Sequence, residues 1–395
     1  NPPDLANNAF GLQRNLGMRE IVGYAPVEPD GSVMVKVPAG IPLALEVLDG
    51  EGRRIGPRHD NWFQVQAGDT VTCVGCHDPA NGGSEPGVHA RGDSETPSIN
   101  SGVPASQEFV NTLIPGGTSP DPYRGAVGQT MAEVRFATVA ATDPALEPQL
   151  SADLTYVDYW TDPDAPDLLL QGRVADPTYD YLYADLGTPP PGNNFCSPWQ
   201  DRCRVAINYT EHIQPIFMLD RGADDFTPAA PGTVDPNNTT ATPLLEVNAP
   251  NGIGDDTCTE CHTGLNNNAQ LPYGQLDLTI DPNQVLTDFP RSYQQLFFTK
   301  QALDNALAPI PNTNVQPSMT RLGARRSYFI EKMTGIELDA ARTVSGTVHD
   351  HSPGSTTTHD HSTMLTGDEL KLISEWLDLG GQNFNDPFNP AVPTN

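Results

Sequence analysis

The sequence has few basic residues and few apolar residues. Its 395 residues include 21 Lys and Arg against 50 Asp and Glu, which gives a formal net charge of −29. A surface this acidic repels phosphate backbones and anionic lipids, so nucleic-acid binding and peripheral membrane binding are disfavoured. Apolar residues make up 37% of the chain, below the roughly 45–50% of an average globular protein. The chain can therefore bury only thin cores.

Long apolar runs are also missing. No stretch approaches the roughly 18 consecutive apolar residues that a membrane-spanning helix needs. Gly and Pro are abundant instead, with 35 and 39 residues, and both are typical of turns and loops. We therefore expect an α+β fold with much irregular structure and no membrane span.

Four of the six cysteines lie in two copies of the pattern Cys-x-x-Cys-His, at residues 73–77 and 258–262. Two thiols about one helical turn apart can each add to one vinyl group of a porphyrin, and the adjacent His then ligates the iron. The pattern predicts two covalently bound haem c groups. The predicted attachment residues and proximal ligands are Cys73, Cys76 and His77 for the first haem, and Cys258, Cys261 and His262 for the second.

Two other sites use Cys-x-x-Cys pairs. A zinc site can be built from two such pairs, but it does not need a His directly after each one. A thioredoxin-like redox pair needs one motif within a βαβ unit, and no such unit is indicated. Haem attachment therefore explains the motifs best.

The remaining pair, Cys196 and Cys203, lies in a short turn-rich segment that can close a small disulfide loop; two buried thiols are the alternative. Disulfides persist outside the cytoplasm, where haem of this kind is also attached. The chain opens with Asn1, Pro2 and Pro3, as a mature protein does after its signal peptide is cleaved. We expect a periplasmic or extracellular protein.

The sixth ligand of each iron decides the chemistry, because a filled position favours electron transfer and an open one permits catalysis. For the second haem the first candidate is His361, which directly precedes a predicted helix, with His359 and Met364 as rivals. For the first haem the candidates are His59, His212 and His89. The histidines between 349 and 361 can also form a divalent-metal or proton-binding loop, or an ordinary polar loop.

Three units are expected along the chain. Residues 1–130 are predicted to form a small β-sandwich, with strands at 21–27, 32–37, 43–48 and 62–65, that leads into the first haem site and its loop. Residues 131–204 form a second β-rich unit, with strand-like segments at 133–137 and 168–174 and the disulfide loop. Residues 205–395 form a cytochrome c-like domain, with helices at 208–217, 291–307, 327–334 and 366–379.

Two sets of segments resemble a known family. Residues 23–32, Gly-Tyr-Ala-Pro-Val-Glu-Pro-Asp-Gly-Ser, and the strand into residues 73–79 resemble the alpha subunit of hydrazine synthase and its multihaem relatives. Residues 209–217, 257–262 and 361–381 resemble the cytochrome c module of the same wider group. The resemblance implies a dihaem periplasmic or extracellular cytochrome, in which a His or Met just before the last helix reaches over the haem.

Two functions are compatible with these observations. The first is a dihaem electron carrier, whose partners are redox proteins or other copies of the chain; a head-to-tail contact between copies would form a conductive filament if it does not close. The second is a haem enzyme of the hydrazine synthase or peroxidase type, with one open haem iron. The carrier is the primary prediction.

Overall fold

The structure is a computed structural model. It describes residues 11–12, 17–56, 58–59, 62–72, 129–142, 150–158, 160, 176–219, 257–262, 276–279, 289–302, 308–338, 361 and 364–383. For residues 138–142, 260 and 261 it describes the backbone alone.

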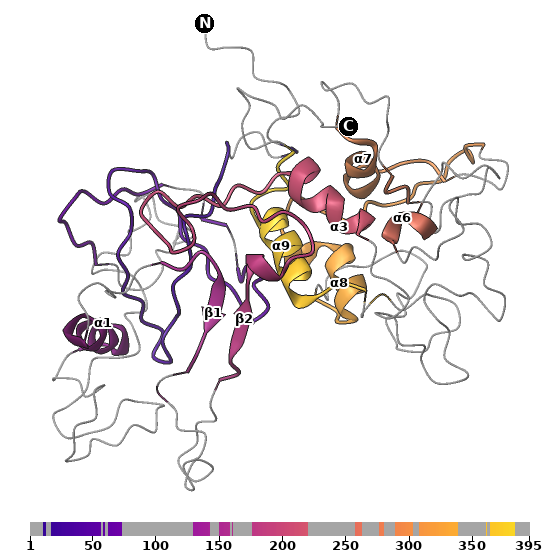
Figure 1. The fold of residues 1–395 in the computed structure, drawn as a ribbon. Helices are drawn as coiled ribbons and strands as arrows, with labels where there is room; N and C mark the ends of the chain where they lie inside the picture. The colour runs from indigo at the N-terminus through magenta and orange to yellow at the C-terminus, as the bar shows by residue number, and fades with distance from the viewer. Residues whose placement is uncertain are drawn as a thin grey trace, which may run out of the picture.

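The described elements are short and mostly helical (Figure 1). α9 (Gly367–Asp378) lies among η4 (Tyr209–Ile213), α3 (Gln214–Met218), α6 (Cys258–Cys261), α7 (Arg291–Phe297), η6 (Ala324–Arg326) and α8 (Tyr328–Thr334). The hairpin of β1 (Leu154–Tyr156) and β2 (Tyr179–Tyr181), followed by η3 (Tyr183–Asp185), packs beside α9, and α1 (Met131–Thr142) lies apart from the helices. The expected mixed and largely irregular fold is confirmed.

The core is built around α9. Leu372, Ile373, Trp376 and Leu377 of this helix are completely buried, because their spacing places them on one stripe of the helix. Aromatic rings surround Trp376: the ring centres of Tyr209 and Phe297 both lie 5.4 Å from it, and that of Tyr293 lies 6.0 Å away. This core lies in the part of the chain for which we predicted a helical domain.

The predicted β-sandwich at residues 21–65 is not found in the described part of that segment. Its backbone pairs only through isolated bridges, such as Leu43 with Phe63 and Leu48 with Arg54. Leu45 and Val47 alternate as strand residues do, but their side chains are 61% and 54% exposed. A ribbon of two short strands is marginal without further strands or a covering layer, and tight turns interrupt this segment.

The expected strand at 133–137 is wrong, because these residues lie in α1. The N-terminus of this helix is capped locally by Thr130 Oγ1, which accepts from the N–H of Glu133 at 3.2 Å, and also by a distant turn. In that turn Asp30 Oδ2 accepts from the N–H of Met131 at 2.9 Å, and Ser32 Oγ accepts from that of Ala132 at 3.0 Å. Helix N-termini need such acceptors for their unpaired N–H groups. The other expected strand, at 168–174, lies outside the described residues.

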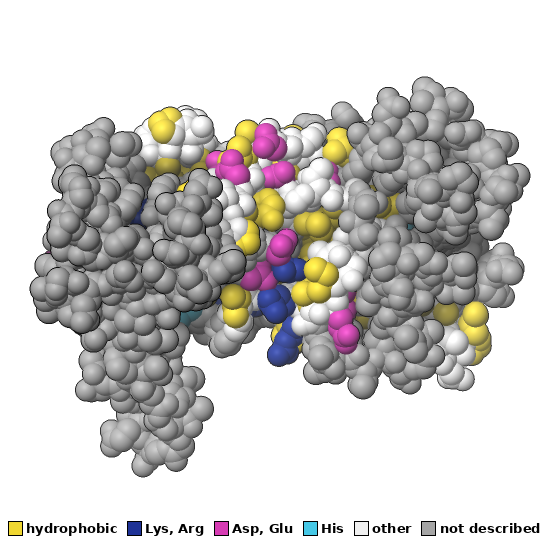
Figure 2. Space-filling view, turned by 90° about the horizontal axis from the view of Figure 1, so that it is seen from below, with side chains coloured by type: hydrophobic (Ala, Val, Ile, Leu, Met, Phe, Trp, Pro, Cys, Tyr) yellow, Lys and Arg dark blue, Asp and Glu magenta, His cyan; other side chains and the backbone are white. Residues whose placement is uncertain are grey.

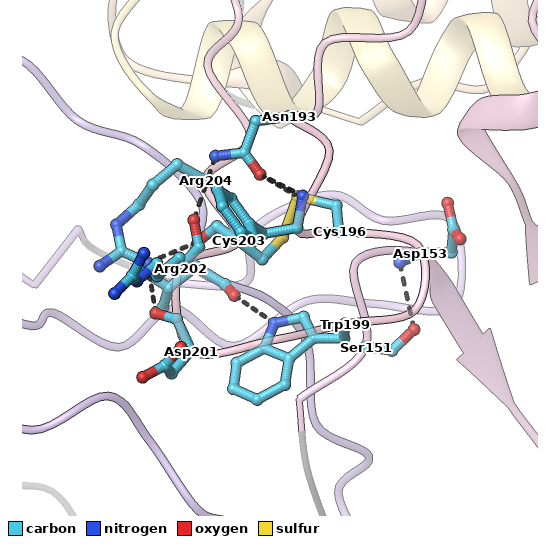
Figure 3. Close-up of a disulfide and its surroundings, with 11 residues drawn as sticks. Ser151, Asp153, Asn193, Cys196, Trp199, Asp201, Arg202, Cys203 and Arg204 are labelled. Carbon is cyan, nitrogen blue, oxygen red and sulfur yellow. Dashed lines mark hydrogen bonds between the residues drawn. A yellow bond between two sulfur atoms is a disulfide. The ribbon is translucent and has the colours of Figure 1, made fainter.

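The rest of the second unit contains the β-hairpin and the disulfide. β1 and β2 are antiparallel, with Leu154 opposite Tyr181 and Tyr156 opposite Tyr179. The predicted Cys196–Cys203 disulfide is present (Figure 3). Its loop is attached to the N-terminal segment through Trp199, whose indole donates to the Val22 carbonyl at 2.8 Å. The disulfide therefore fixes a corner at which two distant segments meet.

Three of the predicted helices agree closely with the structure. Thr366 caps α9 with a complete capping box that involves Glu369, Asn208 caps η4, and α8 matches the segment predicted at 327–334. The helix predicted at 291–307 is shorter: α7 ends at Phe297, where the backbone of Phe298 becomes extended. None of the helices in the described residues is both long and apolar enough to cross a bilayer.

The N-terminal segment binds directly to α9 and the residues after it. The N–H of Arg19 donates to Gln382 Oε1, and that of Arg54 to Asp378 Oδ2, both at 2.8 Å. The hydroxyl of Tyr24 donates to the carboxylate of Glu375. These contacts join the first and third predicted units; the boundaries at residues 130 and 204 remain a prediction.

Candidate functional site

The second Cys-x-x-Cys-His motif forms one helical turn. α6 spans Cys258–Cys261, and the N–H of His262 donates to the Cys258 carbonyl at 3.0 Å. Residues three apart lie on the same side of a helix, so the backbone places the two cysteines on one side of the turn. Cys258 is half-buried against the core. The motif therefore has the local shape that attachment of one group through two thiols requires.

The structure brings His262 and His361 together. Their ring centres lie 6.2 Å apart, with 34° between the ring planes. His361 is held in a turn that leads to α9, because its carbonyl accepts from the N–H of Met364 at 3.1 Å and the next residue, Leu365, is buried.

This spacing fits one metal ion between two imidazoles. A metal–nitrogen bond of about 2 Å on each side, with about 1 Å more from each nitrogen to the centre of its ring, adds up to about 6 Å. His262 also adjoins the two cysteines. The residues present therefore fit a haem that is attached at α6 and ligated on both faces.

The backbone of His262 is held by buried groups. Its carbonyl accepts from the N–H of Leu278 at 2.8 Å. The Leu278 carbonyl accepts from Gln214 Nε2 at 2.9 Å, and Gln214 Oε1 accepts from the hydroxyl of Ser292. The neighbouring Asp277 forms an ion pair with Arg291 of α7 at 2.8 Å. Gln214, Leu278 and Ser292 thus link the Cys-x-x-Cys-His motif to α3 and α7.

His212 has a defined structural contact. It is 8% exposed, its Nδ1 accepts from the N–H of Asn208 at 3.1 Å, and burial lowers its pKa. A neutral imidazole that accepts at Nδ1 carries its proton on Nε2, and a metal needs a nitrogen without a proton. Ligation by His212 at Nε2 would therefore require this hydrogen bond to change.

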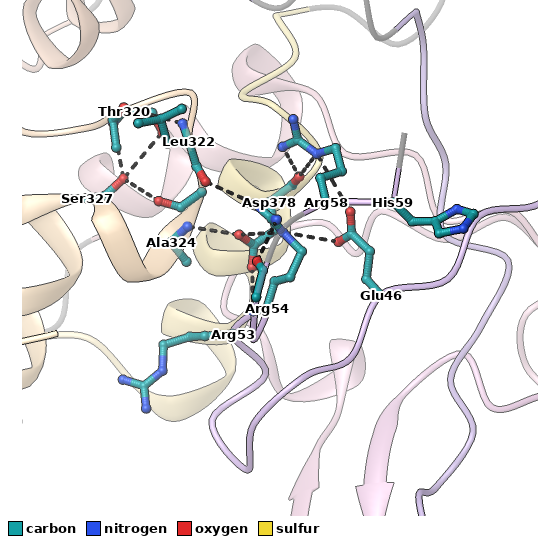
Figure 4. Close-up of polar contacts among 12 residues, drawn as sticks. Glu46, Arg53, Arg54, Arg58, His59, Thr320, Leu322, Ala324, Ser327 and Asp378 are labelled. Carbon is teal, nitrogen blue, oxygen red and sulfur yellow. Dashed lines mark hydrogen bonds and ion pairs between the residues drawn. The ribbon is translucent and has the colours of Figure 1, made fainter. Parts of the chain in front are cut away.

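His59 is half-buried, and its carbonyl accepts from Arg19 Nη1 at 3.4 Å. Figure 4 shows its ring turned away from the neighbouring cluster of charged residues. The first Cys-x-x-Cys-His motif, at residues 73–77, lies outside the described residues, as does His89. Ligation of a first haem by His59 or His212 remains a prediction.

The other candidates near His361 are only partly described. Met364 is half-buried in the turn before α9, while His359 and the remaining histidines from 349 onwards lie outside the described residues. Within the described part of the chain, no group of three or more His, Cys, Asp or Glu residues is placed to hold a metal ion.

Two of the buried charged residues of α9 form an ion pair with each other in the core. Lys371 and Glu375 are 1% and 4% exposed, with 3.0 Å between Nζ and Oε1. The ammonium group also lies 3.8 Å from the centre of the Tyr183 ring, and the Tyr183 hydroxyl donates to Glu375 Oε2 at 2.9 Å. Burial raises the pKa of Glu375 and lowers that of Lys371 to about 7. The aromatic surroundings favour the cation where water cannot reach it.

A second charged cluster surrounds the end of α9 (Figure 4). Asp378 accepts from the N–H groups of Arg54 and Ala324, at 2.8 and 2.9 Å. Arg58 Nε donates to the Asp378 carbonyl at 3.0 Å, and Glu46 lies 3.7 Å from the guanidinium groups of both arginines. A positive charge at a helix C-terminus is favourable. Figure 2 likewise shows basic and acidic side chains adjoining one another on one face of the molecule.

The segment at residues 23–32 has a structural role. Glu28 is 7% exposed and accepts from Trp160 Nε1 at 2.6 Å and from Arg135 Nη1 at 3.0 Å. Asp30 and Ser32 cap α1. The polar residues of this segment therefore connect α1 and Trp160 to the N-terminal segment.

Nothing in the sequence indicates that Gln214 and Ser292 are buried, because polar residues in short helices are usually exposed. Lys371 and Glu375 were missed for a different reason: four residues apart on a helix, they resemble an ordinary surface ion pair. Both residues lie on the polar side of the helix, opposite the apolar residues 370, 372, 373, 376 and 377, so the sequence has no signal of their burial.

Comparison with known proteins gives one match. A family model described as the hydrazine synthase alpha subunit middle domain matches residues 6–78. This segment is related to that family, and it includes the first Cys-x-x-Cys-His motif. No curated protein and no solved structure matches the chain.

Proposed function

We propose that the protein is an extracytoplasmic c-type cytochrome that carries electrons. The observation that carries the proposal is the 6.2 Å spacing of the His262 and His361 rings beside the cysteines of α6. Cys258 and Cys261 would hold the haem through thioether bonds, with His262 and His361 as its axial ligands.

When bound, haem supplies a one-electron couple between ferric and ferrous iron. The protein residues determine how that couple is used. His262 and His361 would leave no position on the iron open to a substrate, so electron transfer is the chemistry that such a haem would supply. The backbone contact of His262 with Leu278 would limit the rearrangement that each transfer requires.

The second covalent haem of the proposal uses Cys73, Cys76 and His77, with His59 or His212 as its sixth ligand. The repeated motif supports this assignment. The Cys196–Cys203 disulfide supports a periplasmic or extracellular location, because disulfides persist in oxidising compartments. The partners would be other redox proteins or further copies of the chain.

Mass measurement of the denatured protein tests the attachment. The wild type should retain two haems, and the Cys258→Ala, Cys261→Ala double variant should retain one. Haem stoichiometry that is unchanged in this variant would rule out the assignment of α6. The visible spectrum of the reduced protein, with and without carbon monoxide, then tests the carrier function: neither haem should bind the gas rapidly.

The match at residues 6–78 favours a second candidate, a haem enzyme of the hydrazine synthase type. The first haem motif lies at the end of the matched segment, so its iron would be the open one. In this case one of two reduced haems should bind carbon monoxide rapidly, and the Cys73→Ala, Cys76→Ala variant should lose that binding. Binding that persists in this variant would assign the open iron to the other motif.

A further inference from the structure

A continuous chain of buried hydrogen bonds connects α7 to the backbone of His262. The Ser292 hydroxyl donates to Gln214 Oε1, Gln214 Nε2 donates to the Leu278 carbonyl, and the Leu278 N–H donates to the His262 carbonyl. Ser292, Leu278 and Gln214 are 0%, 2% and 4% exposed. Water cannot replace any of these bonds without a rearrangement of the core.

Gln214 is the central member of this chain, and its side-chain amide can lie in only one orientation. The Leu278 carbonyl can only accept, so the NH2 group of Gln214 must face it, and the amide oxygen is left for the Ser292 hydroxyl. The amide therefore joins the extended segment at 276–279 to α7, and no backbone hydrogen bond joins these two segments in the described part of the chain.

A π-turn determines where Gln214 lies. Its N–H donates to the carbonyl of Tyr209, five residues earlier, and α3 begins directly after this turn. The turn starts at Asn208, whose side chain accepts from the N–H of Glu211. Single π-turns are uncommon and occur often at functional sites, because they displace a side chain relative to a regular helix.

We infer that Gln214 is a positioning residue for the haem ligand His262. The inference rests on the proposed function and adds to it a residue outside the attachment motif. Gln214 does not touch the haem in this assignment; it acts through Leu278, whose N–H fixes the backbone at which the imidazole is attached. Groups that orient a metal ligand typically change metal affinity or activity 10- to 100-fold when removed.

The test compares two buried glutamines. Gln382 is 1% exposed, and its amide bonds to both the N–H and the carbonyl of Arg19, each at 2.8 Å. It thus resembles Gln214 in burial and hydrogen bonding but is not connected to His262 by these bonds. Gln214→Met and Gln382→Met should both lower the midpoint of denaturation, which controls for general destabilisation.

Only Gln214→Met should change the haem. Both variants are made with Cys73→Ala and Cys76→Ala, so that the second haem is observed alone. The rate of carbon monoxide binding to the reduced protein is limited by release of an axial His, and it should rise about 10- to 100-fold in Gln214→Met and stay unchanged in Gln382→Met. The midpoint potential should shift in the first variant alone.

The Ser292→Ala variant provides a milder form of the same test. It removes the hydroxyl that orients the amide but leaves the backbone contacts intact, so a smaller rise in the same rate is expected even if Gln214→Met does not fold. Equal rates in Ser292→Ala, Gln382→Met and the parent protein would overturn the role of Gln214. A parent protein without low-spin haem at α6 would instead refute the proposed function, and the inference with it.

Discussion

Lys371 and Glu375 place a cation and an acid where water cannot reach them, at 1% and 4% exposure. Removing two charges from water is costly, and the pair is stable only because its partners compensate. Each charge depends on the other, so the loss of one should be more harmful than the loss of both.

Lys371→Met should therefore destabilise the protein by about 3–5 kcal/mol, because it leaves the carboxyl of Glu375 without its cation. Adding Glu375→Gln should restore part of this loss, since the amide oxygen can still accept from one of the hydroxyls of Tyr24 and Tyr183 and the amide NH2 can donate to the other. Chemical denaturation of both variants measures the difference. A double variant less stable than the single one would contradict the argument.

If the protein is the proposed cytochrome, His361→Ala should convert the haem attached at α6 from low spin to high spin, while His349→Ala should not. His361 lies in a turn that is held by Met364 and leads to the cap of α9, so little entropy is lost when its ring is fixed over iron. Absorption spectra of the oxidised protein report the change. A low-spin spectrum in His361→Ala, with a high-spin one in Met364→Ala, would assign the ligand to Met364.

Glu46 should make stability depend on pH. Burial raises its pKa from 4.5 to about 7, Asp378 adds to the rise, and Arg54, Arg58 and Arg19 oppose it. The folded protein thus keeps a proton that the unfolded chain releases near pH 4.5, and this contribution to stability is lost as the pH rises to 7.

The Glu46→Gln variant should remove this part of the pH dependence. The decrease in unfolding free energy between pH 5 and pH 8 should shrink by on the order of 1–3 kcal/mol. Some dependence should remain, because burial also raises the pKa of Asp378. A variant with the same slope as the wild type would show that Glu46 keeps an ordinary pKa.

Among the elements, α9 was the most predictable and α1 the least. The cap at Thr366, the acidic first turn and the glycines after Leu379 define α9 within a single stretch of sequence. α1 does have a local capping box, in which the Thr130 hydroxyl accepts from the N–H of Glu133 and the Glu133 carboxylate accepts from that of Thr130, but the alternating residues at 133–137 favour a strand. Its next two N–H groups bond to Asp30 and Ser32, about a hundred residues earlier, and no local pattern shows these contacts.

The candidate site was likewise predictable where it depends on local sequence patterns, and not where it depends on packing between distant segments. The motif at 258–262 and the helix after His361 are local patterns, and they were sufficient to suggest His361. The support of His262 by Gln214 and Leu278 depends on packing between three segments, so the sequence alone could not predict it. The sandwich was predicted from alternating apolar residues, but Leu45 and Val47 lack a layer to cover them.

The capping box of α9 should contribute measurably to stability. Thr366 Oγ1 accepts from the N–H of Glu369 at 3.2 Å, and Glu369 Oε2 accepts from that of Thr366 at 2.9 Å. Thr366→Ala should cost about 0.5–2 kcal/mol in unfolding free energy. Thr313→Ala is a matched control, because Thr313 makes one exposed bond to the Ile310 carbonyl. Equal effects would mean that the box does not stabilise the helix.

For the whole molecule, the net charge of −29 should make stability depend on salt. Repulsion among so many carboxylates opposes the compact state, and salt screens it, since the Debye length falls from about 30 Å at 0.01 M to about 8 Å at 0.15 M. The melting temperature should therefore rise over this range of sodium chloride. A decrease would mean that ion pairs such as Arg325 with Asp49 outweigh the repulsion.

The contacts between the N-terminal segment and α9 also determine when the protein can fold. The partners Arg19 and Gln382 are 363 residues apart in the sequence, and Tyr24 and Glu375 are 351 apart. At about 5–20 residues per second, ribosomes need roughly 20–70 s to make the chain between Arg19 and Gln382. Until then the core lacks its central helix. The early segments can therefore complete their native contacts only after the C-terminal helix has been made.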